Sequence, residues 1–236
     1  MPNSIVSSGR PKIAAEVGSE AELRKQLRGS LRVWSEVALE PIGVHPAAHH
    51  LRLIEELEAI APGRSGRLLV HMPPGVAKST YASVLFPAWW LARSPRRSLI
   101  AAYHTGQLAE HFGRQVRSLL EERGQQLGCS VSADQRAAQR LATVAGALYY
   151  ATGVNGPVVG RRADLLLIDD PIRNQAEADS AGARERLWDW FRSDLVSRLK
   201  PGGSIVLVMT RWHPDDLAGR LAATGDWRTL VLPAVA

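Results

Sequence analysis

Apolar residues follow two different patterns along the chain, one before residue 60 and one after it. Over residues 20–39 they recur every three or four positions, which predicts a single amphipathic helix. The apolar stripe of this helix consists of Leu23, Leu27, Leu31, Trp34 and Val37. The segment "EPIGVHP" interrupts the pattern, and Pro46 suits the first turn of a second helix that ends near Ile60.

Beyond residue 66, short and almost continuously apolar runs alternate with helical patterns. The predicted strands are 67–72, 97–103, 163–170, 204–210 and 227–232, with β-like pieces around "ALYYATG". The predicted helices between them are 78–92, 106–122, 177–199 and 214–224. Strands that are apolar throughout and separated by helices predict a parallel sheet with helices on both faces.

Three unusual polar clusters directly follow predicted strands. They are "PPGVAKST" after the first strand, "DDP" after the strand at 163–170 and "TRWHPDD" after the strand at 204–210. In a parallel α/β sheet, ligands bind outside the carboxyl ends of the strands. We therefore expect the three clusters to meet in one binding site.

The first cluster has the chemistry of a phosphate-binding loop. A phosphate needs a run of backbone N–H groups, a helix N-terminus and a cation, which Lys78 can supply. The usual pattern G-x-x-x-x-G-K-[ST] would need glycine at 72 and 77, where this chain has Met72 and Ala77. Ala77 adds only one methyl group, and we expect it to adopt helical backbone angles. The candidate binding residues are Pro74, Gly75, Val76, Ala77, Lys78, Ser79 and Thr80. The alternative is an ordinary strand-to-helix turn capped by Ser79.

The second cluster places two carboxylates, Asp169 and Asp170, at the end of a buried strand. In P-loop ATPases the first such acid serves Mg²⁺, together with the loop hydroxyl (here Ser79), and the next orients the attacking water. A carboxylate pair that caps the next helix is the alternative. In the third cluster, Thr210, Arg211 and His213 could sense the γ-phosphate, and Asp215 and Asp216 are expected to cap the following helix.

Two further groups of polar residues have open roles. Arg161 and Arg162 could stabilise transition-state charge, in the same subunit or a neighbouring one, or could contact DNA phosphate or solvent. His45 and His49 lie four residues apart, but without a third ligand they do not indicate zinc. A role in packing or in framing a nucleotide base fits this histidine-rich segment better.

Composition and charge limit the function classes. The net charge of +6 favours a polyanionic partner, since Lys and Arg neutralise phosphates. The single cysteine, Cys129, cannot form an internal disulfide, which fits a reducing, intracellular setting. No apolar run approaches the roughly 20 residues of a membrane helix, and the first residues lack the apolar region of a secretory signal.

Taken together, the motifs resemble the ATPase half of the large terminase subunit of tailed bacteriophages and prophages. The segments that carry the resemblance run from about Trp34 onwards and are "MPPGVAKSTYASVLFPAWWLA", "AAYHTGQLAEHFGRQVRSLLEE", "GRRADLLLIDDPIRN" and "VMTRWHPDDLAGRL". The resemblance implies an α/β fold of the P-loop NTPase class (ASCE, RecA-like), a three-layer sandwich with a mostly parallel central sheet.

The resemblance also implies an activity: DNA-stimulated ATP hydrolysis that translocates double-stranded DNA into a procapsid, with ATP and Mg²⁺ bound. By motif, Lys78 and Ser79 match the Walker A lysine and hydroxyl, Asp169 the Walker B acid and Asp170 the catalytic acid. Thr210, Arg211 and His213 match the coupling motif. The implied partners are DNA, a portal protein, a small terminase subunit and further copies in a ring, in the host cytoplasm and without a membrane.

This chain departs from the family pattern at two positions. Relatives commonly have Arg where this chain has Gly75, and commonly Glu where it has Asp170. The expected organisation is a flexible lead over 1–19, a helical entry segment over 20–62 and an ATPase domain over 63–236. Large terminases continue into a nuclease domain, whose activity is not expected here. The alternatives are a catalytically impaired prophage remnant and another DNA-dependent, helicase-like ATPase.

Overall fold

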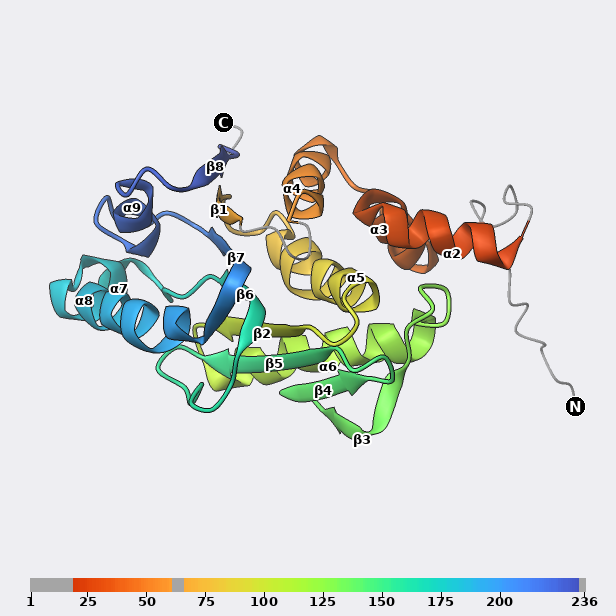
Figure 1. Ribbon diagram of the computed structural model, residues 1–236. Helices are drawn as coiled ribbons and strands as arrows, with labels where there is room; N and C mark the ends of the chain where they lie inside the picture. The colour runs from red at the N-terminus through yellow and green to blue at the C-terminus, as the bar shows by residue number, and fades with distance from the viewer. Residues whose placement is uncertain (1–18, 61–65, 234–236) are drawn as a thin grey trace, which may run out of the picture.

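The computed structural model describes residues 19–60 and 66–233, which form an eight-stranded sheet between two layers of helices (Figure 1). The strand order is β3-β4-β5-β2-β6-β7-β1-β8. The strands are β1 (Arg67–His71), β2 (Ser98–Tyr103), β3 (Val131–Ala137), β4 (Arg140–Thr143), β5 (Leu148–Gly153), β6 (Ala163–Asp169), β7 (Leu199–Met209) and β8 (Arg228–Val231). Nearly all of the predicted flexible lead lies outside the described residues.

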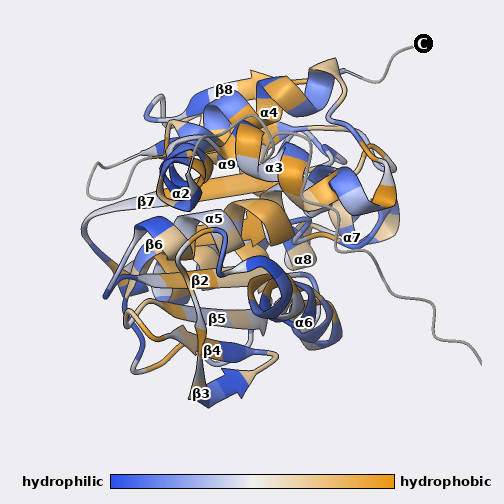
Figure 2. Ribbon diagram, turned by 90° about the vertical axis from the view of Figure 1, so that its right-hand side faces the viewer, coloured by the Kyte–Doolittle hydropathy of each residue, from blue (hydrophilic) through white to orange (hydrophobic). Residues whose placement is uncertain are grey.

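Most neighbouring strands are parallel, as the sequence predicted. All pairs from β5 through β2, β6, β7 and β1 to β8 run parallel, whereas β3 and β4 are antiparallel to each other and β4 to β5. The hairpin of β3 and β4 was not predicted, because β3 ("VSADQRA") is polar and lies at the exposed edge of the sheet (Figure 2). An edge strand with a solvated face lacks the apolar run that marks a central strand.

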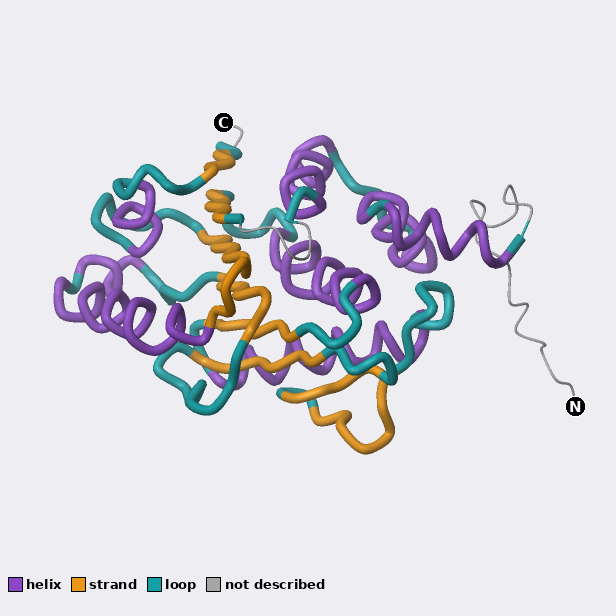
Figure 3. The backbone as a smooth tube through the Cα atoms, viewed as in Figure 1, coloured by secondary structure: helices purple, strands orange, loops and turns teal. Residues whose placement is uncertain are grey.

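Helices cover both faces of the sheet (Figure 3). On one face lie α2 (Glu20–Gly29), α3 (Leu31–Leu39), α4 (Ala48–Glu58), the π-helix η2 (Thr80–Leu85), α5 (Phe86–Arg93) and α6 (Gly106–Arg123), and a short 3₁₀ turn η1 (Glu40–Ile42) follows α3. On the other lie α7 (Gln175–Asp179), α8 (Ala181–Asp189), η3 (Trp190–Leu195), η4 (Val196–Arg198) and α9 (Leu217–Ala222).

Alternating strand residues divide the core between these two layers. In β6, Leu165 and Leu167 belong to the core beneath α2–α6, while Leu166 and Ile168 belong to the core beneath α7–α9. Successive side chains of a strand point to opposite faces, so a strand covered on both sides must be apolar throughout. This arrangement is why the apolar runs located the central strands correctly.

Two long helices predicted from periodicity are interrupted by serine caps. The segment 20–39 forms two helices because the Ser30 hydroxyl accepts a hydrogen bond from the Val33 N–H, while the Glu58 carboxylate accepts one from the Leu31 N–H. In the same way Ser180 caps α8 and separates it from α7. Apolar periodicity continues across such a break, so it does not reveal a cap that restarts the helix.

Candidate phosphate-binding site

The sheet brings the three polar clusters together at the carboxyl ends of its central strands. Strand β7 lies between β1 and β6, and the register places His71 opposite Met209 and Asp169 opposite Val208. The residues that follow these strands, Met72, Asp170 and Thr210, therefore emerge at the same level. The prediction that the clusters meet at the carboxyl ends of the strands is confirmed.

The loop after β1 has a strained backbone. Gly75 has a φ of +78° and Ala77 a φ of +56°, whereas Val76 between them does not have a positive φ. Left-handed residues that alternate with ordinary ones turn successive N–H groups toward a common centre, which suits an anion. The expectation of helical angles for Ala77 is wrong: the turn needs the left-handed angle that glycine adopts freely, and alanine adopts it at a cost of roughly 1–2 kcal/mol.

Lys78 is buried and joins all three clusters. Its Nζ lies 2.7 Å from Oδ2 of Asp170 and donates to the hydroxyl of Thr210 at 3.3 Å. The Thr210 N–H donates to Oδ1 of Asp170 at 2.9 Å, and its hydroxyl donates to the carbonyl of Met72 at 3.2 Å. Thr210 is thus bonded to the start of the loop, to the loop cation and to the acid after β6.

Asp170 leaves the sheet in a left-handed conformation. Its φ is +42°, and its N–H donates to the carbonyl of Val208 at 2.9 Å. Aspartate tolerates positive φ better than most residues, yet such angles cost free energy and concentrate at functional sites. The bend places the Asp170 carboxylate against Lys78 while its side chain remains 37% exposed, so a water molecule can reach it.

Asp169 is buried, and one of its oxygens has no partner. Oδ2 accepts a hydrogen bond from Ser83 at 2.7 Å, but Oδ1 has none. Burial, reinforced by the neighbouring Asp170, raises the pKa of Asp169 to about 6, although the hydrogen bond from Ser83, the Ser79 hydroxyl and the charge of Lys78 lower it. A buried carboxylate with a free oxygen beside a serine hydroxyl fits a hard cation such as Mg²⁺.

A metal at this position would need additional ligands from substrate and water. Among the residues that the structure describes, no group of three or more His, Cys, Asp or Glu could hold a metal ion. Mg²⁺ in nucleotide sites is usually bound by one or two carboxylates together with substrate phosphates and water. Ser79 and Asp169 therefore match a metal that arrives with a nucleotide better than a permanent metal centre.

No hydrogen bond or ion pair joins Arg211 or His213 to the described residues of the phosphate loop. Arg211 donates through Nε to Asp216 at 2.9 Å and through a terminal nitrogen to the carbonyls of His213 and Pro214. Asp216 caps α9, as predicted, whereas Asp215 pairs with Arg184 and Arg220 instead of capping. Of the predicted coupling residues, only Thr210 contacts the phosphate loop.

The same part of the chain matches a protein family. The family model described as "Terminase large subunit, T4likevirus-type, N-terminal" matches residues 70–231, well over half of the chain. The chain belongs to this family. The matched range contains the phosphate loop, both carboxylates and Thr210. No curated protein matches the terminase chain.

Solved structures show the fold of the terminase chain. The large terminase of bacteriophage HK97 is similar with a TM-score of 0.58 and 11% identity, covering 83% of this chain and 42% of that protein. The ATPase domain of the large terminase of Thermus phage P74-26 is similar with a TM-score of 0.45 and 16% identity over 71% of each chain. At such identities only the fold is shown, and it rests on the HK97 protein. The predicted P-loop fold class is confirmed, and the chain spans less than half of the HK97 protein's length.

Two predicted site residues lie away from the loop. Arg161 and Arg162 precede β6, whereas Asp169 is its last residue, and seven strand residues span roughly 20 Å. The Arg161 guanidinium lies 3.5 Å from the ring centroid of Tyr150, and Arg162 is exposed. The structure does not bring these arginines to the loop of their own subunit, so a role in a neighbouring subunit stays a prediction.

Two polar contacts of the terminase site were not anticipated from the sequence. Ser83, which bonds to Asp169, lies in η2, and a lone serine in the apolar segment "YASVLFPAWW" was its only signal. His50 of α4 lies 3.0 Å through Nε2 from the carbonyl of Val76. The segment "HPAAHH" drew attention to the histidines but not to their contact with the loop.

Proposed function

We propose that this terminase chain is an ATPase motor that hydrolyses ATP to move double-stranded DNA into a procapsid. The observation that carries the proposal is the junction of Lys78, Asp170 and Thr210, where a loop cation, a strand-end acid and a neighbouring strand are directly bonded. In a member of the terminase large subunit family, this junction matches a site that binds phosphates, activates water and transmits the result.

In the proposed reaction, the N–H groups of residues 75–80 bind the phosphates of ATP, and Lys78 turns from Asp170 to the β- and γ-phosphates. Asp170, released from Lys78, orients the attacking water at the γ-phosphate. Ser79 and Asp169 would hold Mg²⁺, which neutralises phosphate charge when bound. Asp170 is shorter than the glutamate common in relatives, so its carboxylate would lie about one methylene further from the water.

In the proposed motor, the coupling of ATP hydrolysis to DNA movement would begin at Thr210. Its hydroxyl and N–H bond to Met72, Lys78 and Asp170, so any shift of Lys78 or Asp170 alters the start of the β7–α9 connection. Arg211 and His213 occupy that connection and are proposed to pass the change onward. Their bonds to Asp216 and to the connection's own backbone make it one hydrogen-bonded unit.

Arg161 and Arg162 are proposed to act from a neighbouring copy of the chain. In a ring of identical subunits, a head-to-tail interface can bring the amino ends of the strands of one copy against the carboxyl ends of the strands of the next. The test mixes a Lys78→Ala variant, whose arginines are intact, with a double Arg161→Ala, Arg162→Ala variant, whose loop is intact. Recovery of turnover in the mixture supports the neighbouring-copy role; no recovery contradicts it.

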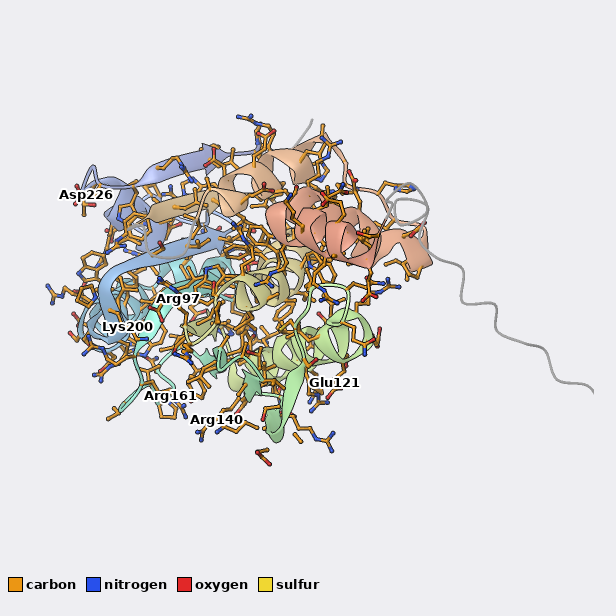
Figure 4. The ribbon with its side chains drawn as sticks, turned by 45° about the vertical axis from the view of Figure 1, so that its right-hand side comes forward. Arg97, Glu121, Arg140, Arg161, Lys200 and Asp226 are labelled. Atoms are coloured by element: carbon orange, nitrogen blue, oxygen red, sulfur yellow. The ribbon has the colours of Figure 1, made fainter. Side chains whose placement is uncertain are left out.

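DNA is proposed to bind through its phosphates at a basic pair, Arg97 and Lys200 (Figure 4 labels both). These residues lie at the amino ends of β2 and β7. Asp164 is the carboxylate that pairs with Lys200 at 2.8 Å and with Arg97 at 3.6 Å. Two cations share this one carboxylate, which leaves an excess of positive charge for phosphates, so binding should be salt-sensitive and weakly dependent on sequence.

The wider setting follows the family. A portal protein and a small terminase subunit are proposed partners, and the host cytoplasm is the proposed location. Within residues 19–60 and 66–233, no helix has the length and apolar character to span a membrane.

ATP hydrolysis measured with and without double-stranded DNA tests the proposed function. The wild-type chain should hydrolyse ATP faster with DNA, and Lys78→Ala should abolish turnover because the loop loses its cation. ATP hydrolysis that continues in Lys78→Ala, or a wild-type chain that does not hydrolyse ATP, would contradict the proposed motor function and favour an impaired remnant. Strand separation in the same assay would favour a helicase-like ATPase instead.

A further inference from the structure

One residue of the N-terminal helical segment reaches the phosphate loop. His50 lies in the first turn of α4, and its Nε2 is 3.0 Å from the carbonyl oxygen of Val76. The other ring nitrogen, Nδ1, accepts a hydrogen bond of 3.0 Å from the backbone N–H of Ala47. The contact joins two segments that are 26 residues apart in the sequence.

These two bonds determine which nitrogen carries the proton. Nδ1 accepts from an N–H group, so it must be unprotonated. A neutral imidazole then carries its proton on Nε2, and that N–H donates to the Val76 carbonyl. Burial of the ring lowers the pKa of His50 and so favours this neutral form.

The ring is also held by its neighbours. His50 stacks on Tyr81 with ring centroids 4.3 Å apart, and the His49 ring lies 3.9 Å away on α4. Tyr81 is buried and belongs to η2, the first helical segment after the loop. His50 therefore contacts both the loop and the helix that follows it.

The carbonyl that His50 contacts belongs to Val76 of the phosphate loop. Val76 lies between the two left-handed residues, Gly75 and Ala77. In a trans peptide the C=O and the next N–H point in opposite directions. By holding the Val76 carbonyl toward α4, His50 turns the Ala77 N–H to the opposite side, away from α4.

We propose that His50 is a positioning residue that fixes the Val76–Ala77 peptide of the phosphate loop in its anion-binding orientation. This role rests on the proposed function only in taking ATP and ADP as the ligands. It also gives α4, which precedes the phosphate loop in the chain, a direct effect on nucleotide affinity. Alanine at position 77 makes such support necessary, because its left-handed angle is not favourable by itself.

Two substitutions separate the two hydrogen bonds of His50. In His50→Gln the side-chain amide can still donate to Val76, but the acceptor for Ala47 is lost. In His50→Asn the shorter side chain can still accept from Ala47, but it no longer reaches Val76. A helix-start role and a loop-positioning role therefore predict opposite rankings of the two variants. His49→Ala is the matched control, since it removes a neighbouring ring without removing either bond.

The first measurement is ADP and ATP affinity of the full chain by calorimetry. His50→Asn should weaken binding about 3- to 10-fold, as expected for one lost hydrogen bond at a fixed site, and raise KM more than it lowers kcat. His50→Gln and His49→Ala should stay within about 2-fold of the wild type. Equal affinities for the Gln and Asn variants, or the reverse ranking, would overturn the proposal.

The second measurement needs no nucleotide. Hydrogen exchange of the loop amides in the free chain should accelerate in His50→Asn and stay close to the wild type in His50→Gln, at equal free energy of unfolding. If the wild type fails to bind ATP, the proposed function fails, while the exchange pattern still decides the role of His50. Identical loop exchange in all variants would overturn that role.

Discussion

Asp170 and Asp216 both lie beyond the carboxyl ends of the strands and have similar partners, but their surroundings differ. Asp170 accepts from Thr210 and pairs with Lys78; Asp216 accepts from backbone N–H groups and pairs with Arg211. Asp216 is 0% exposed, whereas the Asp170 side chain is 37% exposed. Thr210 and Arg211 are adjacent in sequence, yet each belongs to a different one of these two clusters.

The cluster around Asp216 and the cluster around Asp170 differ in whether their polar groups all have partners. Asp216 caps α9 from an ordinary extended backbone (φ −75°, ψ 174°), and both of its oxygens accept hydrogen bonds. Around Asp170, by contrast, the backbone is left-handed at Asp170 and Ala77, and Oδ1 of Asp169 is buried without a partner. A fully satisfied cluster stabilises the fold, whereas strain and an open oxygen are retained where a ligand completes the site.

The largest expected effect is on turnover. Asp170→Asn should lower the rate of ATP hydrolysis by roughly 10²- to 10⁴-fold, because the amide cannot orient and deprotonate water. Nucleotide affinity should be retained, since Lys78 is no longer held by a carboxylate. Steady-state hydrolysis and ADP calorimetry on the same preparation test both parts. Lost binding would instead assign Asp170 to the metal.

Asp216 should show the opposite profile. Asp216→Ala should lower the free energy of unfolding by roughly 3–5 kcal/mol, because it leaves Arg211 and the first turn of α9 without their partner. Urea denaturation measures this loss. Asp215→Ala is the control, since the Asp215 side chain is 48% exposed and loss of its ion pairs with Arg184 and Arg220 should cost much less. Equal losses for both variants would show that the cap is not the main contribution of Asp216.

The sequence predicted the first cluster better than the second. The strand-end positions of Lys78, Asp169, Asp170 and Thr210 follow from apolar runs, because parallel strands end at a common edge. Asp216 was expected to be a cap, but its pairing with Arg211 depends on how the β7–α9 connection folds. The left-handed angle of Ala77 and the contact from His50 also depend on tertiary geometry, which residue spacing does not encode.

A smaller effect should distinguish the buried carboxylate by its pH dependence. The pKa of Asp169 is about 6 in the folded chain, against 3.8 for an ordinary aspartate. The folded state therefore binds this proton more tightly, and the free energy of unfolding falls as pH rises from about 4 to about 6, by roughly 2–3 kcal/mol. Asp169→Asn should remove this fall, so without nucleotide it should gain stability relative to wild type as pH rises.

Urea denaturation of the two proteins across pH 4–7 measures that difference. The relevant quantity is the gap between variant and wild type, because other titrating groups contribute equally to both. A gap that stays constant with pH would mean that the Asp169 carboxylate is not destabilised by its surroundings. Ser83→Ala should widen the gap between Asp169→Asn and the protein with Asp169, since the Ser83 hydroxyl is one of the groups that lower the pKa of this acid.

The smallest expected effect concerns backbone strain in the loop. Ala77→Gly should relieve roughly 1–2 kcal/mol of left-handed strain but increase the entropy of the unfolded chain, for a net gain of about 0.5 kcal/mol. Gly75→Ala is the matched opposite: its φ of +78° penalises a side chain although no atom lies within 4 Å of the added Cβ, so it should destabilise by about 1 kcal/mol. Denaturation midpoints measure both changes. If Ala77→Gly destabilised the chain as much as Gly75→Ala, the bonds of Val76 and Lys78, rather than the backbone preference of residue 77, would determine the shape of the loop.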